Sequence, residues 1–117
     1  MKREIKFRVW DEDNNTIGTV LSFTNLENLR HDLDGIEDYF GRGYFKDNPN
    51  YLMQYTGLKD KNGVEIYEGD IIKYYNRVGV VRFRKGQFEI YSGDDGYILS
   101  LFSIYKDKKK VIGNIHE

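Results

Sequence analysis

The chain has 117 residues, a length at which one domain is usual, so two independent enzymatic domains are excluded. It is 39% hydrophobic and 15% aromatic, which is enough large apolar surface for a packed core and excludes general disorder. The net charge of −1 gives no long-range attraction to phosphate or anionic membranes, and the lack of cysteine excludes disulfides, thiolate metal sites and cysteine nucleophiles.

The first predicted element is a β-hairpin. Near the N-terminus, Ile5, Phe7 and Val9 alternate with polar side chains, a period of two that places these three residues on the core face of a strand. Residues 11–16 are turn formers, and residues 17–23 predict the second strand of the hairpin.

A short helix and a loop are expected next. Residues 24–27 match a capping box, in which a threonine hydroxyl and a glutamate side chain satisfy N–H groups at the start of a helix. Leucine and isoleucine then recur at helical spacing, which predicts one short helix within residues 24–40. Residues 41–50 contain the only proline and no periodicity, so this loop is the expected internal boundary.

The remainder of the chain predicts short strands. Seven β-type runs are separated by glycines, a pattern typical of a small barrel or sandwich. They are residues 51–56, 64–67, 70–75, 80–84, 88–91, 97–105 and 111–115. We therefore predict a mainly β fold in a single domain, residues 1–117. Residues 1–50 form its N-terminal β-hairpin, short helix and loop, and residues 51–117 form a small β-barrel, SH3-like part.

The chemical motifs in the sequence are incomplete. Asp11, Asp13 and Asn15 have the first spacings of a calcium loop, but Thr16 and Ser22 occupy its glycine and glutamate positions. The two histidines have no ligand pattern around them, and no serine lies in a nucleophile-elbow context. We therefore expect no catalytic residue, no cofactor and no metal site, and hence no enzyme.

Interleaved basic and aromatic residues form the candidate binding surface. Its members are Lys6, Arg8 and Trp10 on the first strand and Arg82 and Arg84 on a later one. Small barrels bind single-stranded nucleic acid through such faces, because cations follow the phosphates and aromatic rings stack on bases. Alternating charges also keep a half-buried strand soluble, and the net charge of −1 favours that interpretation. The charged run at residues 106–110 is expected to be a solvated turn.

One long stretch carries a family signature. Residues 52–63 read LMQYTGLKDKNG and continue as VEIYEGDII to residue 72, a pattern that resembles the YopX family of phage and prophage proteins. Shorter matches follow in the expected order at residues 6–11, 79–83 and 111–117. The resemblance covers the C-terminal two-thirds of the chain and, in the N-terminal third, its first strand.

The signature residues are expected to be structural. Asn62 and Gly63 are a type I′ turn pair, and we expect Gly69 in a backbone conformation that is costly for other residues. Asp70 can accept hydrogen bonds from nearby N–H groups of the turn. Gly57 and Tyr67 complete the set.

The resemblance implies a phage or prophage origin, action in the bacterial host's cytoplasm, self-association, and no established activity or cofactor. We therefore expect a non-enzymatic protein that binds a host or phage protein or forms a homo-oligomer, and its ten tyrosines suit an interface. A small-barrel nucleic-acid-binding or regulatory protein is the alternative. The sequence has neither a signal-peptide core nor a stretch of ~20 apolar residues, so no membrane partner is expected.

Overall fold

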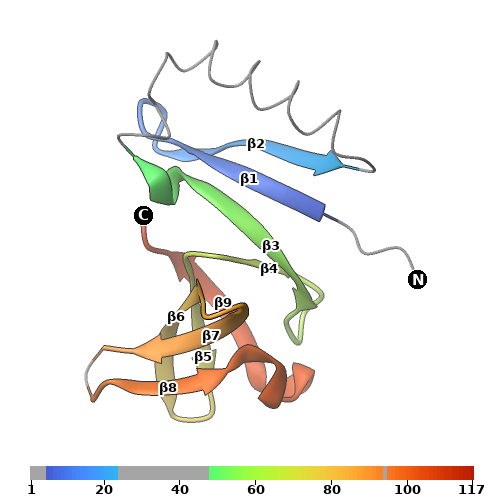
Figure 1. Cartoon of the computed structure of the whole chain (residues 1–117), viewed down its shortest axis with the longest axis vertical. Helices are drawn as coiled ribbons and strands as arrows, with labels where there is room; N and C mark the ends of the chain where they lie inside the picture. The colour runs from blue at the N-terminus through green and yellow to red at the C-terminus, as the bar shows by residue number, and fades with distance from the viewer. Residues whose placement is uncertain (1–4, 24–47, 94) are drawn as a thin grey trace. The chain divides into compact units, whose positions relative to one another are not determined.

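The computed structural model describes residues 5–23, 48–93 and 95–117 (Figure 1). Over these residues the chain is mainly β, with strands joined by turns and by three short 3-10 helices. The predicted short helix within residues 24–40 lies outside the described residues. Two compact units divide the chain, Met1–Gln54 and Tyr55–Glu117, and the division falls inside a strand a few residues beyond the loop expected as the boundary.

The first unit contains the predicted N-terminal hairpin. Its elements are β1 (Ile5–Asp11), β2 (Thr16–Phe23), the 3-10 helix η1 (Pro49–Tyr51) and the start of β3 (Leu52–Lys59). Strand β1 pairs antiparallel with β2 along one edge and with the first residues of β3 along the other. The hairpin register shifts opposite Val9 and Trp10, which pair with Thr19 and Ile17, so Gly18 is the extra residue of a β-bulge in β2.

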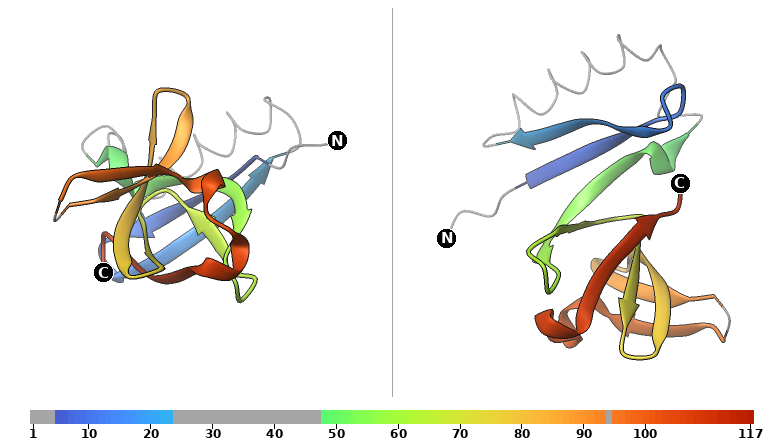
Figure 2. Two further views of the ribbon diagram at one scale, coloured as in Figure 1. Left: turned by 90° about the horizontal axis from the view of Figure 1, so that it is seen from below. Right: turned by 180° about the vertical axis from the view of Figure 1, so that it is seen from behind.

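The second unit contains a larger sheet. Its elements are the rest of β3, then β4 (Glu65–Tyr67), β5 (Asp70–Tyr74), β6 (Arg77–Arg84), β7 (Gln87–Ser92), β8 (Tyr97–Ser100), η2 (Leu101–Ser103), η3 (Lys106–Lys108) and β9 (Lys109–Asn114). Five of these strands form an antiparallel sheet in the order β8-β7-β6-β5-β9, which curls into a half-barrel (Figure 2). The prediction of one strand over residues 97–105 is wrong beyond Ser100, because the chain turns there into η2.

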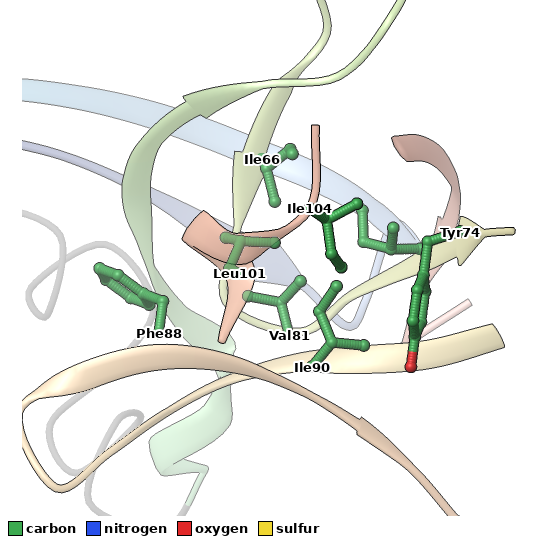
Figure 3. Packing of buried hydrophobic residues seen from close by; sticks show 8 residues of the cluster. Ile66, Tyr74, Val81, Phe88, Ile90, Leu101 and Ile104 are labelled. Carbon is green, nitrogen blue, oxygen red and sulfur yellow. The ribbon is translucent and has the colours of Figure 1, made fainter. Parts of the chain in front are cut away.

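The hydrophobic core of the second unit lies on the inner face of this curled sheet. Alternate residues of β5, β6 and β7 point inward, and residues from β4 and from the segment after β8 complete the cluster: Ile66, Ile72, Tyr74, Val81, Phe88, Ile90, Leu101 and Ile104 (Figure 3). Each fully buried apolar side chain of this size stabilises the fold by roughly 2 kcal/mol. The Tyr74 hydroxyl remains satisfied inside the core, because it lies 3.0 Å from the Ser92 hydroxyl.

Tight turns set the register of the sheet. Strands β6 and β7 pair from Val80 to Tyr91 and are joined by Lys85 and Gly86. Both residues have positive φ, 55° and 79°, as a type I′ turn requires. The sheet is therefore a chain of hairpins, and side chains that face each other across neighbouring strands share one face.

Candidate binding surfaces

Two residues of the candidate binding surface, Lys6 and Arg8, are half-buried in β1 of the first unit. The Nη2 atom of Arg8 donates to the sulfur of Met53 in β3, at 3.6 Å. Arg8 is opposite Met53 in the β1–β3 register, so this contact is part of the strand pairing. The position of the Arg8 guanidinium is therefore fixed by the protein itself.

Trp10 does not lie on the outward face where the alternation placed it. Its side chain is 1% exposed, and its Nε1 donates a hydrogen bond of 2.8 Å to Oε2 of Glu12. Val9 is also buried, so two consecutive residues of one strand avoid water. The physical reason is that β1 lies between β2 and β3 in the sheet and that both of its faces are covered at this end, since the consecutive residues Val9, Trp10 and Asp11 are all buried. The expectation of an exposed Trp10 is therefore wrong.

The other two residues, Arg82 and Arg84, lie on β6 of the second unit and converge on one carboxylate. Their Nε atoms lie 2.6 Å and 3.0 Å from Oε1 of Glu89 in β7. Glu89 is 3% exposed, and the Arg82 guanidinium also stacks 4.2 Å from the centre of the Tyr91 ring. The carboxylate balances one of the two positive charges, and both arginines are engaged within the protein.

The signature residues build a hairpin around Asp60, a residue that the sequence analysis did not single out. Asp60 is fully buried, and its Oδ1 accepts hydrogen bonds from the backbone N–H groups of Asn62 (2.8 Å) and Val64 (2.9 Å). Its Oδ2 accepts from the N–H of Val111 in β9 at 2.9 Å. Burial by itself raises the pKa of Asp60, but these three donors and the nearby Lys61 charge lower the pKa below its ordinary value of 3.8.

The type I′ turn expected at Asn62 and Gly63 is wrong. That turn requires positive φ at both residues, and among the two only Gly63 has it, at 79°. Instead, the Gly63 N–H donates to the Asp60 carbonyl at 3.1 Å, and the Asp60 N–H donates to the Val64 carbonyl at 2.9 Å. The hairpin therefore has a three-residue loop with glycine last, because the Asp60 carboxylate bonds the backbone two residues ahead and selects this geometry.

The second signature turn joins β4 to β5. Gly69 has φ 82°, which confirms the expected conformation. Its N–H donates to the Val81 carbonyl and its carbonyl accepts from the Ile115 N–H, both at 2.8 Å. Asp70 is buried and accepts from the Tyr67 N–H at 2.9 Å, as predicted for a turn aspartate. The turn thus ties β4, β6 and the C-terminal segment together.

The other signature residues lie in the β3–β4 pair. Gly57 has φ 85° within the stretch where the register of this pair shifts. The Tyr67 ring is buried and lies 5.4 Å, centre to centre, from the Tyr55 ring opposite it. These contacts are local packing and leave the rings without access to a ligand.

A row of apolar side chains crosses the outer face of the large sheet. Ile71 is opposite Val80, Val80 is opposite Tyr91, and Tyr91 is opposite Ile98, so these four residues share one face of β5, β6, β7 and β8. Their sequence neighbours on the other face, such as Ile72, form the core. The first three are half-buried, and Ile98 on the edge strand is 40% exposed. We call these four residues the apolar row.

A hollow of about 430 Å³ lies beside the β5–β6 turn and is lined by Asn76, Arg77, Val78, Ser92 and Asp95. Its charges are already paired, because Arg77 Nη1 lies 2.6 Å from Asp95 Oδ2. This hydrogen bond lowers the pKa of Asp95 and raises that of Arg77. The Ser92 hydroxyl bonds Tyr74, so the hollow presents no activated nucleophile.

Over residues 5–23, 48–93 and 95–117, no three His, Asp or Glu side chains gather in a way that could hold a metal ion. No helix in the described part of the chain is long and apolar enough to cross a membrane.

The family model described as YopX protein matches residues 6–117, a span that includes the first strand, the signature and the C-terminal strand. No curated protein matches the chain.

Proposed function

The chain belongs to the YopX family, and from that premise we propose that it is a phage- or prophage-derived, non-enzymatic protein that assembles into a homo-oligomer in the host cytoplasm. The observation that carries the proposal is the apolar row on the outer face of the β5–β8 strands. We also infer that the curled sheet is a small SH3-like barrel, which its run of short antiparallel hairpins supports.

The apolar row has the anatomy of a protein interface. Apolar side chains on a solvent-facing sheet gain about 25 cal/mol for each Å² that a partner covers. The row includes Tyr91, a residue type enriched at interfaces, and the charged cluster of Arg82 and Glu89 lies beside it as a polar rim. It also ends on the edge strand β8, whose free edge invites a further strand.

A second copy of the chain is the occupant that suits this surface. The row itself carries no charge, so its four side chains add no like-charge repulsion between two copies. In a symmetric dimer each row faces its equivalent, which requires a self-complementary patch. Among the described residues, the exposed large hydrophobic side chains all belong to this second unit, so the unit has much apolar surface to cover.

Light scattering over a wide concentration range tests the proposal. We expect a mass above the 13.9 kDa of one chain that falls on dilution. At concentrations at which the original protein assembles, Ile98→Asp should have the mass of a single chain, because assembly would bury the new charge in the contact. Val64→Asp is the matched control, since Val64 is equally exposed but lies in the signature turn.

Two results would overturn the proposal. A constant mass of 13.9 kDa at every concentration would exclude assembly, and would leave a host or phage protein as the partner. Assembly of Ile98→Asp like the original protein, with unchanged circular dichroism, would exclude the apolar row as the contact.

A further inference from the structure

Five exposed lysines belong to segments that meet around the start of β9: Lys61, Lys73, Lys106, Lys108 and Lys110. Lys73 of β5 is directly opposite Lys110 of β9. The Lys61 N–H donates to the carbonyl of the residue before Lys110, at 3.0 Å, which holds the signature turn against the other edge of β9. Lys106 and Lys108 are in η3, which leads directly into β9 (Figure 1). We call these five residues the lysine patch.

The lysine patch differs from the arginines of the same unit in its ion pairs. Each arginine there has a carboxylate within 3.0 Å, either Asp95 or Glu89. No lysine of the patch forms an ion pair with any residue in the described part of the chain. The Asp60 carboxylate nearby is buried and occupied by three backbone N–H groups. Asp107 is the acidic residue within the patch segment, so a positive excess remains.

The excess of positive charge in the lysine patch destabilises the sheet. Like charges directly opposite each other on neighbouring strands destabilise a sheet, and Lys73 and Lys110 are such a pair. Elsewhere in the same sheet the facing charges are complementary, as in Arg82 and Glu89. A repulsive pair without a compensating acid is relieved when an anionic ligand binds.

Two exposed tyrosines accompany the lysines. Tyr105 is 74% exposed, and its carbonyl accepts the N–H of Lys108 at 3.0 Å, so it belongs to the same turn of chain. Tyr75 is 56% exposed and follows Tyr74, which is opposite Lys109 at the same end of β5 and β9. Tyr75 has φ 51° as the first residue of the two-residue turn that joins β5 to β6, so the hairpin fixes its backbone at this end of the sheet.

We propose that the lysine patch, together with Tyr75 and Tyr105, binds single-stranded nucleic acid. The lysines neutralise successive phosphates, and the exposed tyrosine rings stack on bases. The rings are the reason to favour a single strand, because the bases of a duplex are stacked on each other and cannot reach them. The site is distinct from the arginine surface expected from the sequence, and it does not rest on the assembly proposal.

Fluorescence anisotropy with a labelled single strand of about 10 nucleotides tests this inference at about 50 and about 200 mM salt. We expect binding that weakens with salt. Lys108→Gln and Lys110→Gln together should lower the affinity more than about 10-fold and reduce the slope of log affinity against log salt by about 1.4, since each lysine contributes about 0.7 on a single strand. Lys85→Gln is the matched control, an exposed lysine of the β6–β7 turn outside the patch.

Tyr105→Leu separates stacking from charge. Leucine keeps an apolar side chain but loses the ring, so we expect several-fold weaker binding with an unchanged salt slope. Circular dichroism should be unchanged for these variants, because the altered side chains are exposed.

Four outcomes would overturn the inference. The first is no anisotropy change at about 100 μM protein and low salt. The second is a loss of affinity in Lys85→Gln equal to that in the double variant Lys108→Gln/Lys110→Gln. The third is equally tight binding of duplex. The fourth is equal competition by polyglutamate, which would indicate an acidic protein as the partner. Light scattering on the lysine variants should give the mass of the original protein, so failure of this site and failure of assembly are distinguishable.

Discussion

Asp60 is the residue on which the signature hairpin depends, and Asp60→Asn tests that dependence. The amide oxygen can still accept from the N–H groups of Asn62 and Val64, in place of Oδ1. The amide nitrogen then takes the position of Oδ2 and presents hydrogen atoms to the Val111 N–H, which loses its acceptor. A hydrogen bond to a charged group contributes about 1.5 to 3 kcal/mol, so we expect a loss of about 2 kcal/mol in unfolding free energy.

Urea denaturation followed by circular dichroism measures this loss. For a domain of this size, about 2 kcal/mol corresponds to a fall of about 10 °C in melting temperature. Asp60→Ala removes both acceptor oxygens, leaves all three N–H groups without them, and should cost about 4 kcal/mol. Asp107→Asn is the control, because Asp107 is exposed, and the change should stay within about 0.5 kcal/mol. Equal midpoints for Asp60→Asn and Asp107→Asn would refute the argument.

The same carboxylate predicts a pH dependence. The pKa of Asp60 is lower in the folded protein than its ordinary value of 3.8, so the unfolded chain binds the proton more readily. The contribution of Asp60 is therefore complete above the unfolded pKa and is lost as the pH falls through the folded pKa. We expect the stability difference between the original protein and Asp60→Asn to shrink below about pH 4.

Three further substitutions test the packing of the second unit by urea denaturation. Gly69→Val should cost about 1 to 3 kcal/mol, because φ 82° is strained for a β-branched residue, and an unchanged midpoint would contradict this. Gly79→Ala should cost about 2 kcal/mol, since its Cβ would clash with the Ile90 side chain and lie 2.9 Å from a backbone oxygen; a neutral result would show that β7 can move aside. Lys109→Met should raise the urea midpoint at pH 7. Burial lowers the pKa of Lys109, which means that the charged amine is destabilised inside the protein, and its Nζ contacts a carbonyl oxygen 3.5 Å away. The unfolded chain binds the proton of Lys109 more readily, so the stability advantage of Lys109→Met over the original protein should narrow toward pH 10. A lower midpoint for Lys109→Met at pH 7 would contradict the prediction.

Local patterns in the sequence were sufficient for most strands of the second unit. Strand β7 was expected at residues 88–91 and spans Gln87–Ser92, because its alternation and flanking turns are local signals. The sequence predicts the start of the next strand at Val80, with Gly79 as a turn residue, whereas β6 begins at Arg77. Gly79 lies inside the strand, where the close approach of β7 excludes a Cβ, and a packing requirement of this kind has no local signature.

The candidate sites were less predictable, because they depend on pairings between distant strands. The turn at Asp60 has a local pattern, but its bond to Val111 spans 51 residues. The burial of Trp10 likewise depends on distant pairing, because β3 covers the second edge of β1. The sequence predicts a solvated turn at residues 106–110, but residues 109 and 110 begin β9, and Lys109 is buried. The run becomes part of a patch because β9 pairs with β5 and brings Lys73 beside it.

The two proposed surfaces adjoin each other, which allows a final prediction. Ile71 of the apolar row and Lys73 of the lysine patch are two residues apart in β5, so their side chains share the outer face. Assembly through the row would therefore bring the lysine patches of two copies close to the shared contact. A strand long enough to reach both patches would gain affinity from the second contact, because that contact becomes intramolecular.

Ile98→Asp tests this coupling, since it removes assembly and leaves the lysines in place. A strand of about 10 nucleotides should bind this variant as tightly as the original protein. A strand of about 40 nucleotides should bind it at least about 10-fold more weakly, because the gain from a second patch is lost. Anisotropy measured with both strand lengths on both proteins tests whether assembly couples the lysine patches of two copies. An equal loss for the two lengths would show that Ile98 belongs to the nucleic-acid site, and no loss for either would separate assembly from binding.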